Sequence, residues 1–284
     1  MLNDDKCYNV LKFLITGGNG FVGSFLKNKL CSNHHLVKTL GKSKNNDYRV
    51  DLTKDFLKIN EDFNVVIHSA SIVHNPKHAN SINQKLIIED LEITFNLLRC
   101  IEKTSYQKLI FLSSVSVYGI DFGKDINITQ KISPKSGYGF SKAISEKIFI
   151  HNIPKEKLLI LRLPLVNGPN PKGNIKKAMN AIESGKMVLF KGNLAVKTVL
   201  ELEDLYSFLV NRSSKFNGTH QIKSYDIKFN DFINSFSKNR IFYLPIVLLK
   251  MTLFVTKIIK LESLKMTLLK ISSDLTFIDS TKIK

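Results

Sequence analysis

The chain has few cysteines, no tryptophan and no long apolar run. Its three cysteines, Cys7, Cys31 and Cys100, show neither CxxC nor metal-ligand spacing, so we expect neither a disulfide framework nor a metal site. An odd, sparse set suits a reducing compartment. No stretch of 18 uncharged apolar residues occurs, which argues against a membrane-spanning helix, and the polar start Met1–Lys6 does not predict a signal peptide. We therefore expect a cytoplasmic protein.

Acidic residues are also scarce: 24 stand against 42 lysines and arginines, which gives a formal net charge of +18. Such an excess attracts nucleic acid, anionic membranes or phosphorylated ligands. The lysines are dispersed, with no basic run and no interleaved aromatics, so we expect no nucleic-acid partner. The length of 284 residues, 43% of them hydrophobic, suits one large α/β domain or a domain with a smaller lobe.

Short apolar runs alternate with amphipathic helical patterns over the first 165 residues. Continuous runs of this kind are typical of parallel strands buried on both faces. The runs are Leu11–Thr16, Leu36–Leu40, Val65–His68, Leu109–Ser113 and Leu158–Leu163. Two helical faces lie between them, one formed by Phe21, Val22, Phe25, Leu26 and Leu30 and one by Ile87, Leu91, Phe95, Leu98 and Ile101. The alternation predicts an α/β fold with a doubly wound, Rossmann-like parallel sheet over 9–164.

The pattern changes after Leu163, where prolines and glycines form a loop-rich passage. We interpret 165–284 as a smaller substrate-binding lobe, some of whose strands return to the main sheet. Its expected elements are helices at 175–184 and 204–211 and strands at 187–190 and 199–202. A helix beginning near Pro245 carries Lys250, Lys257 and Lys260 on one stripe. This pattern fits either an in-plane membrane helix or a helix packed on the lobe, and we favour the second.

The segment Thr16–Gly23 follows one predicted strand and opens a helix, as a dinucleotide-binding loop does. Its glycines have the spacing GxxGxxG. Gly17 can adopt the positive φ of a tight turn, Gly20 lets the backbone approach a pyrophosphate, and Gly23 lets the helix pack closely. Backbone N–H groups at the helix N-terminus then face the phosphates. The sequence therefore predicts an NAD or NADP site.

The segment after the second strand lacks the acid that binds the adenosine ribose of NAD. Lys42 and Ser43 stand there instead and can hold a 2′-phosphate, which modestly favours NADP, although both also fit a solvent-exposed loop. Asp51, followed by Leu52, can accept a hydrogen bond from the adenine amino group. It can equally cap a helical turn that starts at Thr53.

Two further segments, Ser113–Gly119 and Tyr138–Lys142, supply a hydroxyl, a phenol and an ammonium. Tyr138 and Lys142 are four residues apart and share one helix face. An ammonium there, with a positively charged nicotinamide, lowers the pKa of a phenol and lets it exchange a proton with a sugar hydroxyl. Ser114 can hydrogen-bond the same oxygen. These three residues are the predicted catalytic set.

With these segments in this order, the chain resembles the extended short-chain dehydrogenase/reductases, specifically the NAD-dependent epimerase/dehydratase group that acts on nucleotide-sugars. The resemblance also covers Val65–Ala70, Leu161–Pro164 and Gly168-Pro169. Within the group, the chain looks like the 4-epimerases and 4-ketoreductases of bacterial surface-polysaccharide pathways. It implies a UDP-sugar substrate, hydride transfer at C4, and a homodimer formed through helices near 87–101 and 138–150. The cofactor residues that it adds are Phe21, Val22, Ser69 and Ala70, and the substrate residues are Ser114, Ser116, Asn167 and Lys197.

Several positions depart from the family pattern. Leu165 and Asn167 replace a usual Asn and Tyr, Asp90 stands where an Asn is usual, and Lys197 stands where many members place Arg on the diphosphate. Lysine holds a phosphate as a point charge and not bidentately. A second reading of the same fold is a regulatory protein that senses NAD(P) without turnover. The complete Ser114, Tyr138 and Lys142 set argues against it.

Overall fold

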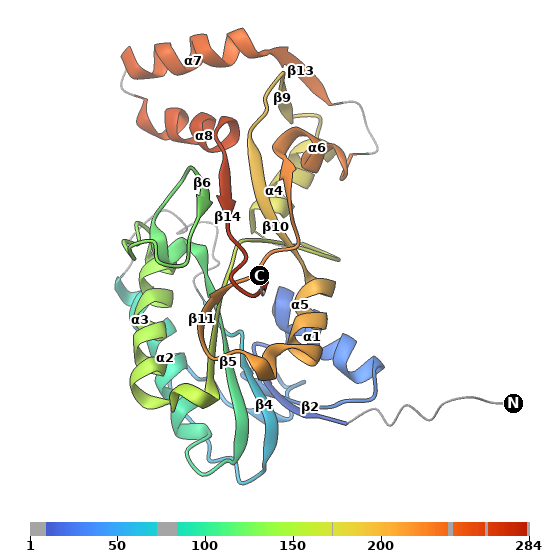
Figure 1. The fold of residues 1–284 in the computed structure, drawn as a ribbon, viewed down its shortest axis with the longest axis vertical. Coiled ribbons are helices and arrows are strands. Elements are labelled where there is room, and N and C mark those ends of the chain that lie inside the picture. Colours follow the sequence, from blue (N-terminus) through green and yellow to red (C-terminus); the bar gives the residue numbers. More distant parts are fainter. Residues whose placement is uncertain (1–9, 73–83, 172, 238–240, 259–260, 283–284) are drawn as a thin grey trace, which may run out of the picture.

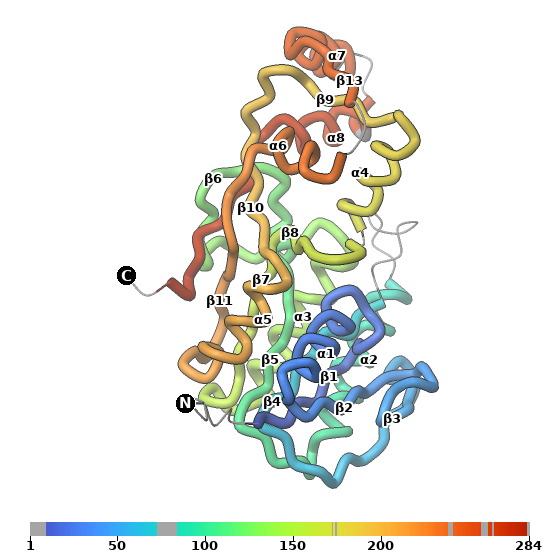
Figure 2. Tube along the Cα trace, turned by 90° about the vertical axis from the view of Figure 1, so that its right-hand side faces the viewer, coloured from blue at the N-terminus to red at the C-terminus, as the bar shows by residue number. Residues whose placement is uncertain are grey.

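In a computed structural model of the chain, the structure describes residues 10–72, 84–171, 173–237, 241–258 and 261–282. Seven parallel strands form the main sheet in the order β11-β7-β5-β4-β1-β2-β3 (Figures 1 and 2). These strands are β1 (Lys12–Thr16), β2 (Leu36–Gly41), β3 (Tyr48–Arg49), β4 (Phe63–His68), β5 (Tyr106–Ser114), β7 (Leu158–Leu163) and β11 (Gly218–Gln221). The five predicted apolar runs are confirmed as strands, and the α/β class is confirmed.

Helices cover both faces of this sheet. Helices α1 (Phe21–Ser32) and α5 (Leu202–Asn211) lie on one face, while α2 (Gln84–Cys100) and α3 (Gly137–Asn152) lie together on the other (Figure 1). Successive strand residues point to opposite faces, so Phe13 and Ile15 pack toward α1 and Leu14 packs toward α2. Both sides of each central strand are therefore buried, which explains the continuous apolar runs.

The apolar face predicted for α2 is only partly the buried one. Ile101, just past the end of the helix, is buried in the core, and Leu98 packs against it. Ile93 and Leu97 pack on the sheet, whereas Phe95 is 44% exposed. The inward face also carries polar residues with buried partners: Asn96 donates from Nδ2 to the carbonyl of Leu52 at 2.9 Å. These polar side chains broke the apolar periodicity of the true inner face, so the outer apolar stripe gave the stronger pattern.

A second sheet stands at the carboxyl end of the first, in the order β12-β10-β14-β6, with β8 also paired to β10. Its strands are β6 (Gly123–Ile126), β8 (Leu165–Asn167), β10 (Val196–Glu201), β12 (Tyr225–Lys228) and β14 (Leu275–Phe277). Strand β6 comes from the first part of the chain, while β11 of the last part lies in the main sheet. The predicted division between 9–164 and 165–284 stays a prediction.

The remaining elements lie beyond the second sheet (Figure 1). They are α4 (Gly173–Glu183), α6 (Phe229–Asn234), α7 (Ile246–Ile258), α8 (Glu262–Ser272), and the parallel pair β9 (Val188–Lys191) and β13 (Phe242–Pro245). The helix predicted to begin near Pro245 is confirmed as α7. Among the described residues, no helix is long and apolar enough to cross a membrane.

Candidate active site

A cavity of about 270 Å³ opens at the carboxyl ends of β1, β2 and β4, where parallel sheets bind ligands. Most of the predicted cofactor residues line it. They are Gly17, Gly20, Lys42, Asp51, Leu52, Ser69 and Ala70. Phe21 and Val22 instead pack against the core, so only their backbone N–H groups remain for a phosphate. Tyr138 and Lys142 lie outside this lining.

The glycine loop has the geometry expected from its spacing. Gly17 has φ +72°, and a Cβ there would lie 2.8 Å from the backbone of Ala70. A Cβ at Gly23 would lie 2.3 Å from the carbonyl oxygen of Gly17, which no side chain tolerates. The loop therefore folds tightly onto α1 and leaves a backbone cradle. Ser71, which lines the same cavity, has a buried hydroxyl with no hydrogen-bond partner among the described residues. The residues present fit a dinucleotide.

Asp51 faces this cavity and also accepts hydrogen bonds from the N–H (3.2 Å) and hydroxyl (2.8 Å) of Thr53. The Thr53 hydroxyl and, more weakly, the charge of Lys42 hold the pKa of Asp51 below its ordinary value. The two uses proposed for Asp51, as a turn cap and as a ligand for adenine, are therefore compatible. Its second carboxylate oxygen has no part in the contacts with Thr53.

The three predicted catalytic residues lie together at the carboxyl end of β5. Ser114 ends β5, its hydroxyl accepts the N–H of Ser116 at 3.1 Å, and the two hydroxyl oxygens are 3.0 Å apart. Ser114 also hydrogen-bonds Tyr138. A Cβ at Gly139 would lie 2.5 Å from the carbonyl of Ser116, so this glycine lets α3 approach closely enough for that contact. Lys142, one turn later, lies with its Nζ 5.7 Å from the Tyr138 ring centroid.

His68 joins the cofactor cavity to the catalytic residues. Its Nδ1 lies 2.7 Å from the hydroxyl of Thr16 at the end of β1, and its ring stacks on Phe111 of β5 at 5.5 Å. Lys142 places its Nζ 4.8 Å from the centre of the same Phe111 ring. Burial, and then the charge of Lys142, lower the pKa of His68 well below its ordinary value. A neutral imidazole here suits packing, as the sequence indicated, and not proton transfer.

Asp90 is the charged neighbour whose effect the sequence did not predict. Its carboxylate is buried and accepts the N–H of Ile72 at 3.0 Å. Burial, and then Asp90, raise the pKa of Tyr138, while the bond to Ser114 opposes them. Burial lowers the pKa of Lys142, and Asp90 and Glu146 partly restore it. The pKa of Tyr138 thus moves opposite to the direction expected from Lys142 alone, because burial and then Asp90 disfavour the phenolate.

We expect an Asp90→Asn variant to shift the acid limb of the pH–rate profile for alcohol oxidation to lower pH. Removing the carboxylate makes the phenolate of Tyr138 less unfavourable, so its pKa falls. The profile of kcat/KM measures this. Glu89→Gln, one residue earlier on α2 and less buried, is the matched control. A profile that is the same in Asp90→Asn and the parent would contradict the role of Asp90.

The two remaining substrate candidates lie in the second sheet. Asn167 of β8 donates from Nδ2 to both carboxylate oxygens of Glu201, at 2.9 and 3.1 Å, and its buried Oδ1 has no partner among the described residues. Lys197 of β10 donates to the carbonyls of Lys270 and Ser273, both at 2.6 Å, at the end of α8. Burial, partly opposed by Asp274, lowers the pKa of Lys197 to about 8. Two of its three N–H donors thus hold α8 in place.

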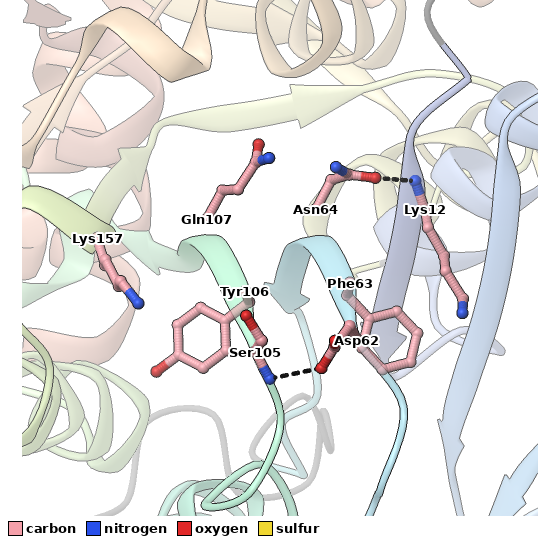
Figure 3. A pocket seen from close by; sticks show the side chains of 8 residues that line it. All are labelled: Lys12, Asp62, Phe63, Asn64, Ser105, Tyr106, Gln107 and Lys157. Atoms are coloured by element: carbon pink, nitrogen blue, oxygen red, sulfur yellow. Dashed lines mark hydrogen bonds between the residues drawn. The ribbon is translucent and has the colours of Figure 1, made fainter.

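A larger hollow of about 480 Å³ lies at the opposite, amino ends of the strands (Figure 3). Figure 3 shows Lys157 and Tyr106 on one side and Lys12 and Phe63 on the other. Two of its side chains bond the backbone of other lining residues: Asp62 accepts the N–H of Ser105 at 2.9 Å, and Asn64 accepts the N–H of Lys12 at 2.7 Å. The hollow contains none of the predicted site residues, most of which line the cavity beside the glycine loop.

The chain is similar to known proteins in sequence and in fold. Residues 13–208, more than half of the chain, match the NAD dependent epimerase/dehydratase family. A candidate UDP-glucose 4-epimerase of Methanocaldococcus jannaschii is 31% identical over 180 residues, 56% of this chain and 58% of that protein. An N-acetyl-α-D-glucosaminyl-diphospho-ditrans,octacis-undecaprenol 4-epimerase of Escherichia coli O157:H7 is 23% identical over 226 residues, 75% and 66% of the two chains. The alignments thus span between half and two thirds of these relatives.

Solved structures share the fold. A UDP-glucose 4-epimerase of Thermotoga maritima, determined with UDP-glucose, superposes with a TM-score of 0.60 at 18% identity, covering 83% of this chain and 86% of that one. Other structures with this fold contain NAD or NADPH. At this identity the likeness shows the fold alone.

Proposed function

Because the chain belongs to the NAD dependent epimerase/dehydratase family, we propose that it is an NAD(P)-dependent 4-epimerase or 4-keto reductase of a UDP-sugar. The observation that carries the proposal is the meeting of Ser114, Tyr138 and Lys142 at the end of β5, joined through His68 to the glycine-loop cavity. The relatives that are UDP-glucose 4-epimerases support the substrate class.

The proposed roles follow from the positions of the side chains. A nicotinamide bound beside these residues would supply the hydride chemistry at sugar C4. Tyr138 takes the proton of the 4-hydroxyl in oxidation and returns it in reduction, Ser114 hydrogen-bonds the same oxygen, and Lys142 stabilises the phenolate. The raised pKa of Tyr138 keeps the phenol protonated at neutral pH, ready to donate to a 4-ketone. A protonated phenol suits a reductase, whereas an epimerase needs Tyr138 both to accept the proton in oxidation and to donate it in reduction.

The substrate residues stay proposals with defined tests. We propose that the unpartnered Oδ1 of Asn167, the hydroxyl of Ser116 and the third N–H of Lys197 contact the sugar and its diphosphate. A Lys197→Met variant should then raise KM for the UDP-sugar. If KM stays at the parent value and only the melting temperature falls, Lys197 stabilises the end of α8 and does not bind the substrate.

The family uses NAD(P), and we propose that this chain prefers NADP. The support is that Lys42 and Ser43 line the cavity directly after β2, and that the segment 39–43, where an acid would bind the ribose of NAD, contains no acidic residue. We expect Lys42→Ala to raise the Kd for NADPH about tenfold, the loss of one charge-assisted contact, and to change that for NADH less than about twofold. Titration calorimetry measures both, with Lys44→Ala as control. An equal effect on the two cofactors would disprove the preference.

We propose a cytoplasmic homodimer that pairs through α2 and α3. The support is the outward apolar stripe of these helices, formed by Ile88, Phe95, Ile144 and Ile150. Burying such side chains is favourable in proportion to their area. Phe95→Lys should therefore convert a dimer into a monomer in sedimentation velocity at micromolar concentration, whereas Leu36→Lys, exposed at the start of β2, should leave the mass unchanged. A monomeric parent chain would refute the dimer.

The product would serve surface-polysaccharide assembly, and one relative is named for a sugar on undecaprenyl diphosphate. A single experiment tests the main proposal: small molecules released from purified protein are identified, and UDP-sugars and their 4-keto forms are then screened for turnover. Bound NAD with interconversion of a 4-epimer pair supports the epimerase. Oxidation of added NADPH only with a 4-keto sugar supports the reductase. Cofactor binding with no turnover of any sugar would favour the NAD(P)-sensing alternative.

A further inference from the structure

Helix α7 has an outer face that no described part of the chain covers. The helix lies at the far end of the molecule from the amino edge of the main sheet (Figures 1 and 2). Its inner side is fixed, because Leu249 is buried together with Phe190 of β9 and Leu268 of α8. Strand β13, which leads into α7, pairs in parallel with β9. The orientation of α7 about its own axis is therefore set by packing, and the outer face is a permanent surface.

This outer face consists of large apolar side chains. Val247 is 59% exposed, Met251 58% and Phe254 66%. Their spacings of four and three residues place them on one side of the helix. Phe242, in β13 just before the helix, is 73% exposed. We call these four residues, with Leu248 and Val255, the α7 face. Large exposed apolar side chains gathered on one helix face in this way mark an interaction surface.

Basic residues border the apolar side chains. At 100° per residue, Lys250 falls at one edge of the α7 face, and it is exposed. From 241 to 272 the chain has one acidic residue, Glu262, against five lysines. Glu262 pairs with Lys265 at 3.1 Å and Lys270 pairs with Asp121 at 3.0 Å, whereas Lys250 has no ion pair with another described residue. The surface combines an apolar centre with a cationic edge, the composition of a helix that lies in a membrane interface.

We propose that the α7 face docks on an anionic lipid bilayer, with the helix in the plane of the interface. Val247, Met251 and Phe254 enter the boundary between headgroups and acyl chains, and Lys250 contacts lipid phosphates. Thirteen residues in α7 are too few to span a bilayer and enough to lie along it. The expectation that this helix packs only on the lobe accounts for Leu249 but leaves the α7 face unexplained.

Charge decides between a bilayer and a second copy of the chain. The formal net charge of +18 attracts the chain to an anionic surface. A symmetric contact between two α7 faces would bring the same basic borders together, and that repulsion opposes association. An anionic surface attracts the same lysines. The proposal does not depend on the proposed sugar activity.

The test is cosedimentation of the full chain with vesicles of phosphatidylcholine and phosphatidylglycerol at low salt. We expect the parent protein to pellet with the vesicles and to be released by added salt. Val247→Ser/Phe254→Ser should lower the partition coefficient at least tenfold. Lys250→Glu should lower it severalfold, since each basic residue near an anionic surface contributes about that factor. All of these side chains are exposed, so the variants should fold like the parent.

Lys103→Glu provides the matched charge control. Lys103 is exposed between α2 and β5, at the amino end of the sheet, and its substitution changes the net charge by the same amount. It should pellet like the parent. Equal losses for Lys103→Glu and Lys250→Glu would mean that the overall charge, and not the α7 face, binds lipid. Failure of the parent to pellet at low salt would overturn the proposal. So would a parent that does not bind vesicles and whose oligomer mass, measured without lipid, changes in Val247→Ser/Phe254→Ser.

Discussion

A Tyr138→Phe variant should lose about 10²- to 10⁴-fold in kcat for oxidation or reduction at sugar C4, the usual contribution of a general acid–base. The phenol is the group placed to exchange the proton, since Ser114 hydrogen-bonds it and Lys142 lies one helix turn away. The ring and its packing remain in the variant, so the free energy of unfolding should change little. Initial rates with a saturating UDP-sugar and cofactor measure the loss.

Tyr106→Phe is the control for this prediction. Tyr106 begins the same strand, β5, at the opposite end of the sheet, and its phenol should not affect turnover. Cofactor affinity should stay near the parent value in both variants. If Tyr138→Phe retained the full rate on the best substrate, Tyr138 would not be the proton donor. Without any measurable turnover in the parent, the NAD(P)-sensing alternative would explain the fold better.

The main sheet and its glycine loop were predictable because their signals are local. A parallel strand buried on both faces reads as one apolar run, as Leu158–Leu163 does, and all six of its residues are buried. The positive φ of Gly17 and the close approach at Gly23 follow from backbone geometry within eight residues. The order of the segments then placed Tyr138 and Lys142 on one turn of α3.

Long-range pairing was not predictable from local pattern. Strand β6 at Gly123–Ile126 pairs with β14 at Leu275–Phe277, about 150 residues later, and both strands are too short to show a clear period. Buried charges were missed for a different reason. Asp90 on α2 interrupts an apolar face and looks like an exposed position. Its departure from the family's Asn was the one signal that could have identified it.

Arg162 and Glu146 form the buried ion pair whose loss should destabilise the fold most. Glu146 of α3 accepts from Arg162 of β7 at two points, Nε to Oε1 at 2.9 Å and Nη2 to Oε2 at 2.7 Å. Ser113 donates to the same carboxylate at 2.6 Å. The guanidinium also donates to the Tyr118 hydroxyl at 3.1 Å, and Tyr118 bonds Gln221 of β11. The pair therefore ties α3, which carries Tyr138 and Lys142, to the edge of the sheet.

We expect Arg162→Met to lower the free energy of unfolding by about 3–5 kcal/mol, because it leaves the Glu146 carboxylate buried without its counter-ion. Urea unfolding at pH 7 measures this loss.

The double variant Arg162→Met/Glu146→Leu separates the buried charge from lost packing. Removing both partners leaves no unpaired charge, so this variant should be more stable than Arg162→Met alone. If the single and double variants were equally unstable, the packing of the two side chains and not the stranded carboxylate would explain the loss. A single variant as stable as the parent would mean that the pair contributes no net stability to the attachment of α3.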